Sequence, residues 1–431
     1  MVRKPELQPF RFDLRELSGA LGDLGVLLPL LAALITLNGL SGSGVLVRVG
    51  LAYLLAGLYY RLPIPVQPLK AMAAIAIAQG LSGSVIAAGG WWMAAVLLLL
   101  AATGLIHWVG RLFNRAIVRG IQLGLALMLI RSGVILINRP QIVYGGAEAL
   151  MRLGAQVPAS WLLAVAAILL LVICLRSRWP AALIVLVFGA IAAITVGKAL
   201  PIVRQVTLGI TLPQLAFPSR EELSAALVFL VIPQLPLTLG NAVFATANAA
   251  RTYFGDRARR VTPKALLTTM GISQMLAAAC GGMPICHGSG GLTAHYKLGA
   301  RSGGAPLILG TLCLCLGLFA GENILPLLAL VPYPVLGVLL VFTGIQHGFL
   351  VRDLARWDEI LTASGIAATS WLTHNLAIGL GVGLLIWQCC RLVRRVTMRT
   401  VARTIHNVGF HHPVTSPTDV APGASDDTNS A

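Results

Sequence analysis

Long apolar segments recur along this chain and restrict what it can fold into. Runs of about 20 residues, the length that an α-helix needs to cross roughly 30 Å of hydrocarbon, follow one another from Leu21 to Gln388. Only 11% of the 431 residues are charged, against about 25% in an ordinary soluble domain. The sequence therefore predicts an all-α polytopic membrane protein that has the lipid bilayer as its solvent.

The breaks between apolar runs predict about fourteen transmembrane segments, seven in each half. The first seven cover residues 19–37, 45–60, 67–79, 87–107, 117–137, 160–175 and 180–198, and the second seven cover 224–248, 265–280, 288–298, 304–320, 323–346, 357–371 and 375–390. The expected parts are an N-terminus (1–17), a first repeat (18–200), a linker (201–223), a second repeat (224–391) and a basic, then disordered tail (392–431).

The distribution of basic residues predicts the orientation. If the N-terminus is cytoplasmic and the segments alternate, 24 of the 32 Lys and Arg residues fall in cytoplasmic loops and 7 in outside loops, with Lys70 alone inside a segment. This bias is typical of membrane topology, so the net charge of +17 does not indicate nucleic-acid binding. We expect both termini to be cytoplasmic, the linker to be extracytoplasmic, and the membrane to be the plasma or inner membrane.

Enzymatic chemistry has no recognisable residue set here. The cysteines match no zinc or disulfide spacing, and Cys286, His287 and His295 form no familiar ligand set. A histidine group in the tail is better explained as solvated than as a metal site. The sequence predicts neither an enzyme nor a bound metal or cofactor.

Two pairs of motifs occupy matching places in the two halves. The first half has SGALGDLGVLLP and, about 43 residues on, PIPVQPLKAMAAIA, whereas the second has PQLPLTLGNAVFAT and, about 44 residues on, MPICHGSGGLTAHY. Aligning Gly22 with Gly240 sets Asp23 against Asn241. Because seven is odd, two sequential seven-segment repeats insert in opposite orientations, and such inverted pairs place the substrate at their interface.

The third and tenth segments are too short to cross the bilayer and read as half-helices. Pro65 and Pro68 prevent a continuous helix before one of them, and Gly288, Gly290 and Gly291 loosen the backbone before the other. Two helix N-termini that face each other offer free amides and positive dipole ends, which suit a compact anion. The alternative is that both motifs are kinks that relieve crowding between helices.

The blocks SGALGDLG, PVQPLK, PQLPLTLGN and MPICHGSGG followed by YKLGARSG resemble the molybdate transporter family over about Leu17 to His347. This family is related to the sulfate permease superfamily, whose members share the fold of the uracil permease. The resemblance implies a core domain of segments 1–4 and 8–11, a gate domain of segments 5–7 and 12–14, and an elevator-like movement of core against gate.

The same resemblance implies which residues bind the oxyanion. The expected set is Gln67, Pro68, Leu69 and Lys70 at segment 3, His287, Gly288, Ser289, Gly290 and Gly291 at segment 10, Gly22 and Asp23 at segment 1, and Gln234, Thr238, Gly240 and Asn241 at segment 8.

Three of these residues carry ionisable groups with alternative roles. Lys70 either neutralises the anion or extends its ammonium toward a segment end. Asp23 either pairs with Lys70 or is protonated during transport, which leads to the hypothesis of proton-coupled uptake. His287 is a second candidate proton carrier, or simply a hydrogen-bond donor.

The predicted function is import of molybdate by a secondary transporter. A sulfate permease is the leading alternative, because sulfate and tungstate are also tetrahedral dianions, and an anion channel is a weaker one. Nucleobase transport fits less well, since Asn241 and Ser289 stand where related nucleobase carriers have acidic residues. Related folds often form homodimers, but no residue here indicates an interface.

Overall fold

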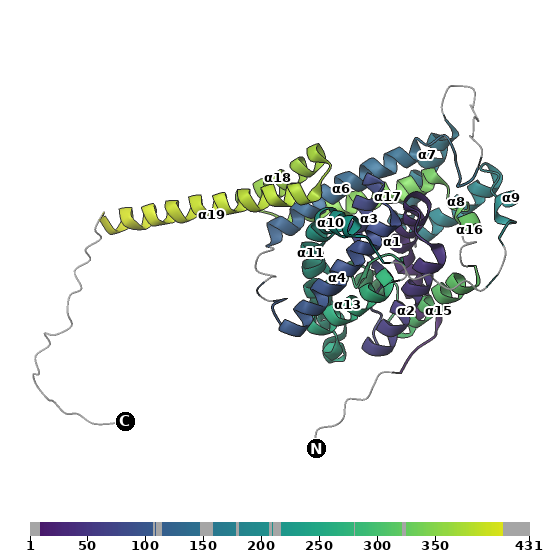
Figure 1. Cartoon of the computed structure of the whole chain (residues 1–431), viewed down its shortest axis with the longest axis horizontal. Helices are drawn as coiled ribbons and strands as arrows, with labels where there is room; N and C mark the ends of the chain where they lie inside the picture. Colours follow the sequence, from purple (N-terminus) through teal and green to yellow (C-terminus); the bar gives the residue numbers. More distant parts are fainter. Residues whose placement is uncertain are drawn as a thin grey trace, which may run out of the picture. The chain divides into compact units, whose positions relative to one another are not determined.

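The structure is a computed structural model. It describes residues 9–106, 108, 114–146, 158–177, 181–206, 209, 217–279, 281–320 and 325–407. The chain forms two compact units, Met1–Ile386 and Trp387–Ala431, and the first contains all the elements discussed below except the later part of the last helix. Figure 1 shows the helices of the first unit with α1 and α3 near its centre.

Each of the expected segments contains at least one helix. The helices of the first half are α1 (Leu14–Asn38), α2 (Gly42–Tyr60), α3 (Lys70–Gln79), α4 (Gly83–Thr103), α6 (Arg115–Ile137), α7 (Ala159–Arg176), α8 (Ala181–Thr195) and α9 (Leu200–Val203). Those of the second half are α10 (Arg220–Ala226), α11 (Ile232–Leu237), α12 (Thr246–Phe254), α13 (Pro263–Ala279), α14 (Ser289–Lys297), α15 (Gly304–Phe319), α16 (Leu325–Leu328), α17 (Tyr333–Phe349), α18 (Trp357–Thr373) and α19 (Leu376–Asn407). Two short strands, β1 (Gln67–Pro68) and β2 (Ile285–Cys286), precede α3 and α14.

The number of membrane crossings stays a prediction. Among the described residues, seven helices are long and apolar enough to span a bilayer, and four shorter apolar helices accompany them. Arg48, which the sequence places in an outside loop, is buried within α2 and is 5% exposed. It therefore does not report the orientation of a loop.

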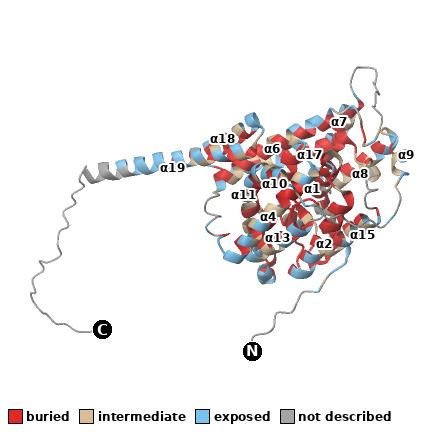
Figure 2. Cartoon of the chain, viewed as in Figure 1, coloured by how far each residue is buried: buried red, intermediate tan, exposed pale blue. Residues whose placement is uncertain are grey.

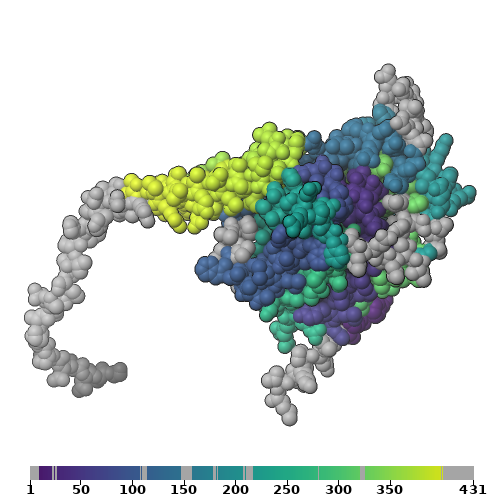
Figure 3. Space-filling model, in the orientation of Figure 1, coloured from purple at the N-terminus to yellow at the C-terminus, as the bar shows by residue number. Residues whose placement is uncertain are grey.

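Helices of the two halves pack against one another in matching pairs. α2 packs on α15, α4 packs on α13, and α6 packs on α17. The contacts are close, because a Cβ added at Gly50 would lie 2.7 Å from the amide nitrogen of Leu314, and one added at Gly133 would lie 2.5 Å from the carbonyl oxygen of Gly337. Figure 2 shows the buried residues gathered on the inward faces of these helices, and Figure 3 shows α4 beside residues of the second half on one face. Such pairing is what a two-fold related repeat produces.

The helical run that opens the second half is continuous but irregular. The π-helical turns η1 (Leu227–Val231) and η2 (Thr238–Ala245) flank α11, which contains Pro233 and Pro236. A proline removes an amide donor and widens the hydrogen-bonding pattern nearby, so π turns are expected at such places. The widened turns set the direction of the side chains that follow, including Gln234 and Asn241.

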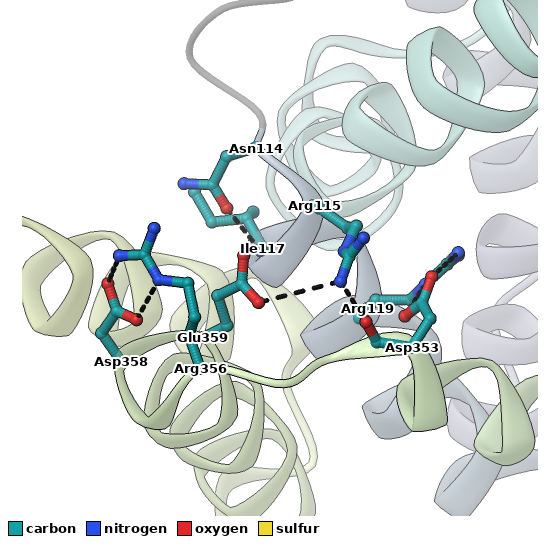
Figure 4. A network of polar contacts seen from close by, with 8 residues as sticks. All are labelled: Asn114, Arg115, Ile117, Arg119, Asp353, Arg356, Asp358 and Glu359. Atoms are coloured by element: carbon teal, nitrogen blue, oxygen red, sulfur yellow. Dashed lines mark hydrogen bonds and ion pairs between the residues drawn. The ribbon is translucent and has the colours of Figure 1, made fainter.

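A polar network joins α6 to the end of α17 and the start of α18 (Figure 4). Nε of Arg119 donates to Asp353 at 3.0 and 3.1 Å, and Arg115 lies 3.9 Å from Glu359. Arg356 pairs with Asp358 in the same region. In the family arrangement, all of these residues belong to the gate domain, so each gate arginine of the network has an acidic partner.

Candidate functional site

The two broken segments meet at a small antiparallel sheet. β1 pairs with β2 in a register that places Gln67 opposite Cys286 and Pro68 opposite Ile285. The residue before a proline favours extended backbone, which fits Gln67 as the first residue of β1, because Pro68 follows it. Pro284 directly precedes β2 and, having no amide donor, disfavours a helix that would continue through this point. Because α3 begins two residues after β1 and α14 three residues after β2, the sheet brings the two helix N-termini together.

Further backbone contacts fix this crossing. The amide of Leu69 donates to the carbonyl of Pro284 at 3.0 Å. The buried side chain of Gln274, from α13, accepts from the amide of Ile285 at 3.1 Å and donates to the carbonyl of the same residue. Non-helical backbone is therefore held by hydrogen bonds inside the protein, as it must be at membrane depth.

The N-terminus of α3 is capped from another helix. Oε1 of Gln234, on α11, accepts from the amides of Ala71 at 3.0 Å and Met72 at 3.1 Å. Nε2 of Gln234 donates to Oγ1 of Thr238 at 3.0 Å, and both side chains are buried. Gln234 and Thr238 thus satisfy and orient the end of α3, and two of the amides that the sequence assigned to the anion are already occupied.

The N-terminus of α14 is open by comparison. Its N-cap residue, Gly288, offers no side-chain cap, so the first amides of Ser289, Gly290 and Gly291 have no acceptor within the helix. Oγ of Ser289 donates to Oδ1 of Asn241 at 2.7 Å. Gly290 is exposed and Ser289 half-buried, so this first turn is accessible.

Lys70 reaches across from the other half-helix. It is the first residue of α3 and half-buried, and a Cβ added at Gly290 would lie 4.0 Å from its Nζ. A cation beside a helix N-terminus is unfavourable by about 0.3–1 kcal/mol when nothing negative lies between them. The ammonium and the first turn of α14 therefore form a place that favours an anion.

Gly288 is required by the closeness of the two strands. A Cβ at this position would lie 2.9 Å from Oε1 of Gln67 and 3.6 Å from Nδ2 of Asn241. The absence of a side chain lets both amide groups approach the turn before α14. Gln67 itself is buried, at 1% exposure.

His287 makes hydrogen bonds to three other parts of the chain. Its Nδ1 lies 2.9 Å from the carbonyl oxygen of Pro65, and its Nε2 lies 3.1 Å from Oγ1 of Thr269, which also hydrogen-bonds Tyr60. Its carbonyl accepts from Thr246 at 2.7 Å. Both ring nitrogens of His287 thus have partners within the protein, and its two considered roles, proton carrier or hydrogen-bond donor, stay predictions.

The other expected site residues lie in α1, at the junction of β1 and α3, and in η2. Gly22 and Asp23 lie within α1, which packs against α3, β1 and α14, and the surroundings of these two residues are outside the described part of the structure. Pro68 and Leu69 link β1 to α3 and are buried. A Cβ added at Gly240 would lie 3.4 Å from Val118 on α6, so Gly240 lies where η2 meets α6.

Sequence reasoning missed three residues near the site. Gln274 and Thr246 hold the backbone of β2 and His287, and their only signal was polarity inside an apolar run. His347, on α17, has a buried Nδ1 without a hydrogen-bond partner among the described residues, and the ammonium of Lys70 acts on it electrostatically. No sequence motif pointed to His347.

Comparison with known proteins agrees with this geometry. The chain matches the family model "Molybdate transporter of MFS superfamily" over residues 15–129 and 226–346, which include both half-helices. It is 28% identical to Molybdate transporter 2 of Arabidopsis thaliana over 415 residues, which is 88% of this chain and 87% of that protein. It is 30% identical to Molybdate transporter 1 of the same plant over 414 residues, with 88% of each chain covered.

Solved structures show the same fold. The transmembrane domain of the cyanobacterial bicarbonate transporter BicA superposes with a TM-score of 0.59 at 18% identity, covering 88% of this chain and 98% of that one. The murine anion transporter Slc26a9 in its inward-facing state gives 0.62 at 16% identity, covering 90% and 70%. From the matched blocks and the two joined half-helices, we conclude that the chain belongs to the molybdate transporter family, whose members are membrane transporters and not enzymes.

Proposed function

We propose that this protein imports molybdate, which binds between the first turn of α14 and the ammonium of Lys70. The observation that carries the proposal is the convergence of one cation and one uncapped helix N-terminus, 4.0 Å from Nζ of Lys70 to a Cβ position on Gly290. The relatives that the chain resembles along most of its length are molybdate transporters by name. Both lines of support concern the same residues, since the matched region contains α3 and α14.

The donors suit a tetrahedral oxyanion better than a halide. Amides at the start of α14 point along the helix axis, Lys70 supplies a full charge, and Nδ2 of Asn241 lies beside the turn. Several directional donors around one charge match four oxygens at fixed angles. A spherical ion would use the charge but few of these directions.

Movement of the core against the gate is the proposed transport step. The β1–β2 sheet ties both half-helices together, so an anion bound between them would travel with its full set of donors. The close approach of Gly240 to Val118 lies on the surface between the moving parts. The Arg119–Asp353 network would keep the two halves of the gate as one body.

Equilibrium binding to the purified protein tests the substrate. Molybdate, tungstate and sulfate would compete for one site, measured by calorimetry at fixed ionic strength. We expect molybdate and tungstate to bind tightly and a large excess of sulfate to leave molybdate binding unchanged. The opposite order of affinity would identify a sulfate permease, and no saturable binding of any of the three would overturn the proposed site.

Coupling to protons is tested at Asp23. In proteoliposomes, uptake of molybdate by the parent is expected to increase when the outside is more acidic, and uptake by Asp23→Asn is expected to lose this response while binding at constant pH persists. Full retention of the pH-gradient dependence in the variant would exclude Asp23 as the carrier. His347→Gln, assayed in parallel, provides the comparison with a second ionisable group, which lies within electrostatic reach of Lys70.

A further inference from the structure

A group of arginines lies at one end of the core helices, away from the anion site. We call Arg11, Arg257, Arg260 and Arg301 the basic face. They come from the segment before α1, the α12–α13 connection and the α14–α15 connection. Contacts join these segments, because Nη2 of Arg257 donates to the carbonyl of Arg301 at 2.7 Å, and the amide of Arg11 donates to Ser302 at 3.1 Å.

Aromatic rings hold three of these guanidinium groups in place. Arg301 lies over Tyr296 with 3.8 Å from Cζ to the ring centre, Arg257 lies 5.7 Å from the ring of Phe254, and Arg260 lies 5.9 Å from that of Tyr59. Stacking on a ring uses the face of the guanidinium and leaves N–H groups at its edge for other acceptors.

The nearby carboxylate is already engaged. Glu16 is 1% exposed, and its two oxygens accept from the amides of Arg301 at 2.9 Å, Ser302 at 2.8 Å and Ala305 at 3.2 Å. In the described part of the chain, the ion pairs lie in the gate network of Figure 4 and none involves the basic face. Arg115, Arg119 and Arg356 of the network in Figure 4 therefore have acidic partners, whereas the arginines of the basic face have rings and carbonyls.

Exposed apolar side chains accompany the basic face. Leu14 is 81% exposed, Phe12 is 67% exposed and Leu58 is 53% exposed, and each lies within a few residues of the arginines or of the ring that Arg260 covers. A free inorganic anion would make no favourable contact with these apolar side chains. An amphiphile has an anionic group for the arginines and hydrocarbon for these side chains.

From this arrangement we infer that the basic face binds the phosphate of an anionic phospholipid. The edge N–H groups of Arg257, Arg260 and Arg301 donate to the phosphate oxygens, because the edge of a guanidinium group can make two parallel hydrogen bonds to one phosphate. Phe12, Leu14 and Leu58 lie against the acyl chains. The same lipid would bridge the α12–α13 and α14–α15 connections, so it would stabilise that part of the protein independently of molybdate.

Thermal unfolding of the full-length protein in mixed micelles tests this inference. Phosphatidylglycerol is expected to raise the melting temperature by about 3 °C or more at saturation, whereas phosphatidylcholine, or inorganic phosphate at the same concentration, is not. The triple variant Arg257→Gln/Arg260→Gln/Arg301→Gln is expected to lose the shift and to keep its affinity for molybdate. Should that variant not fold, the three single variants replace it, and each is expected to reduce the shift.

A matched control removes the same charge elsewhere. Arg176, Arg204 and Arg220 are exposed arginines outside the basic face, and their triple change to Gln is expected to leave the shift intact. Loss of the shift in this control would mean that only net charge matters, and an equal shift with inorganic phosphate would mean that the ligand is a free anion. Either outcome, or no preference for the anionic lipid, would overturn the inference. Molybdate binding is measured in the same samples, so failure of the lipid site and failure of the proposed function can be told apart.

Discussion

The two half-helices begin in the same way but end up with different partners. The amides at the start of α3 are occupied by the carboxamide of Gln234, whereas the turn that opens α14 has only glycine as its N-cap residue. Conversely, α3 supplies the cation, Lys70, that lies near the open turn of α14. The two half-helices are therefore similar in backbone, but in the proposed site they contribute differently: α3 would give charge and α14 directed hydrogen bonds.

This difference teaches that a helix N-terminus is not by itself a binding site. Its amides bind an external anion only if no side chain of the protein has taken them. Substitutions at the N-terminus of α3 and at that of α14 should therefore affect molybdate affinity and thermal stability to different extents.

Loss of the charge from the α3 side should have the largest effect. Lys70→Met is expected to weaken molybdate binding roughly 10- to 100-fold, because a hydrogen bond to a charged group contributes about 1.5–3 kcal/mol. Calorimetry on the purified variant gives the affinity. The matched control, Lys264→Met, changes an exposed lysine at the start of α13 and should bind as the parent does. Parent-like affinity in Lys70→Met would remove the lysine from the site.

An added negative charge at the capped end should have an intermediate effect. Gln234→Glu keeps an acceptor for the amides of Ala71 and Met72, so its melting temperature should stay near that of the parent. Its carboxylate should repel the substrate and weaken binding about tenfold.

The comparison variant Gln234→Ala should lose stability and keep its affinity for molybdate. It leaves two buried amides without an acceptor, which lowers stability by about 1–3 kcal/mol, while the open turn of α14 is unchanged. Thermal unfolding and calorimetry on both variants separate capping from binding. If Gln234→Glu bound molybdate as tightly as the parent, a charge at the N-terminus of α3 would have no measurable effect on the anion at α14, contrary to the proposed site.

Removal of one hydroxyl at the open end should have the smallest effect. Ser289→Ala loses the hydrogen bond that orients the Asn241 side chain beside the open turn, so the anion should lose about one neutral hydrogen bond. An affinity about three- to tenfold lower is expected, since a neutral hydrogen bond contributes about 0.5–1.5 kcal/mol. Ser224→Ala, an exposed serine on α10, serves as the control. A loss as large as that of Lys70→Met would mean that the hydroxyl, and not the ammonium, dominates binding.

Much of the fold could be predicted from the sequence because membrane segments can be recognised by their length and apolar composition. The paired positions of PIPVQP and MPICHGSGG predicted two breaks, and the structure has a half-helix after each. The sheet between them could not be predicted, because two-residue strands carry no alternation. The role of Gln234 was also hidden, since its partner Met72 lies 162 residues away and polarity alone does not distinguish a cap from a ligand.

The small sheet also has a consequence for how the protein is made. Pro68 and Cys286 are 218 residues apart, so β1 cannot pair until the rest of the first half and the beginning of the second half have been translated. Gln234 is missing during most of the same interval, and an unsatisfied amide within a bilayer costs several kcal/mol. The nascent first half therefore has unsatisfied backbone amides at the start of α3. Chains that stop before residue 234 should be degraded rather than accumulate in the membrane.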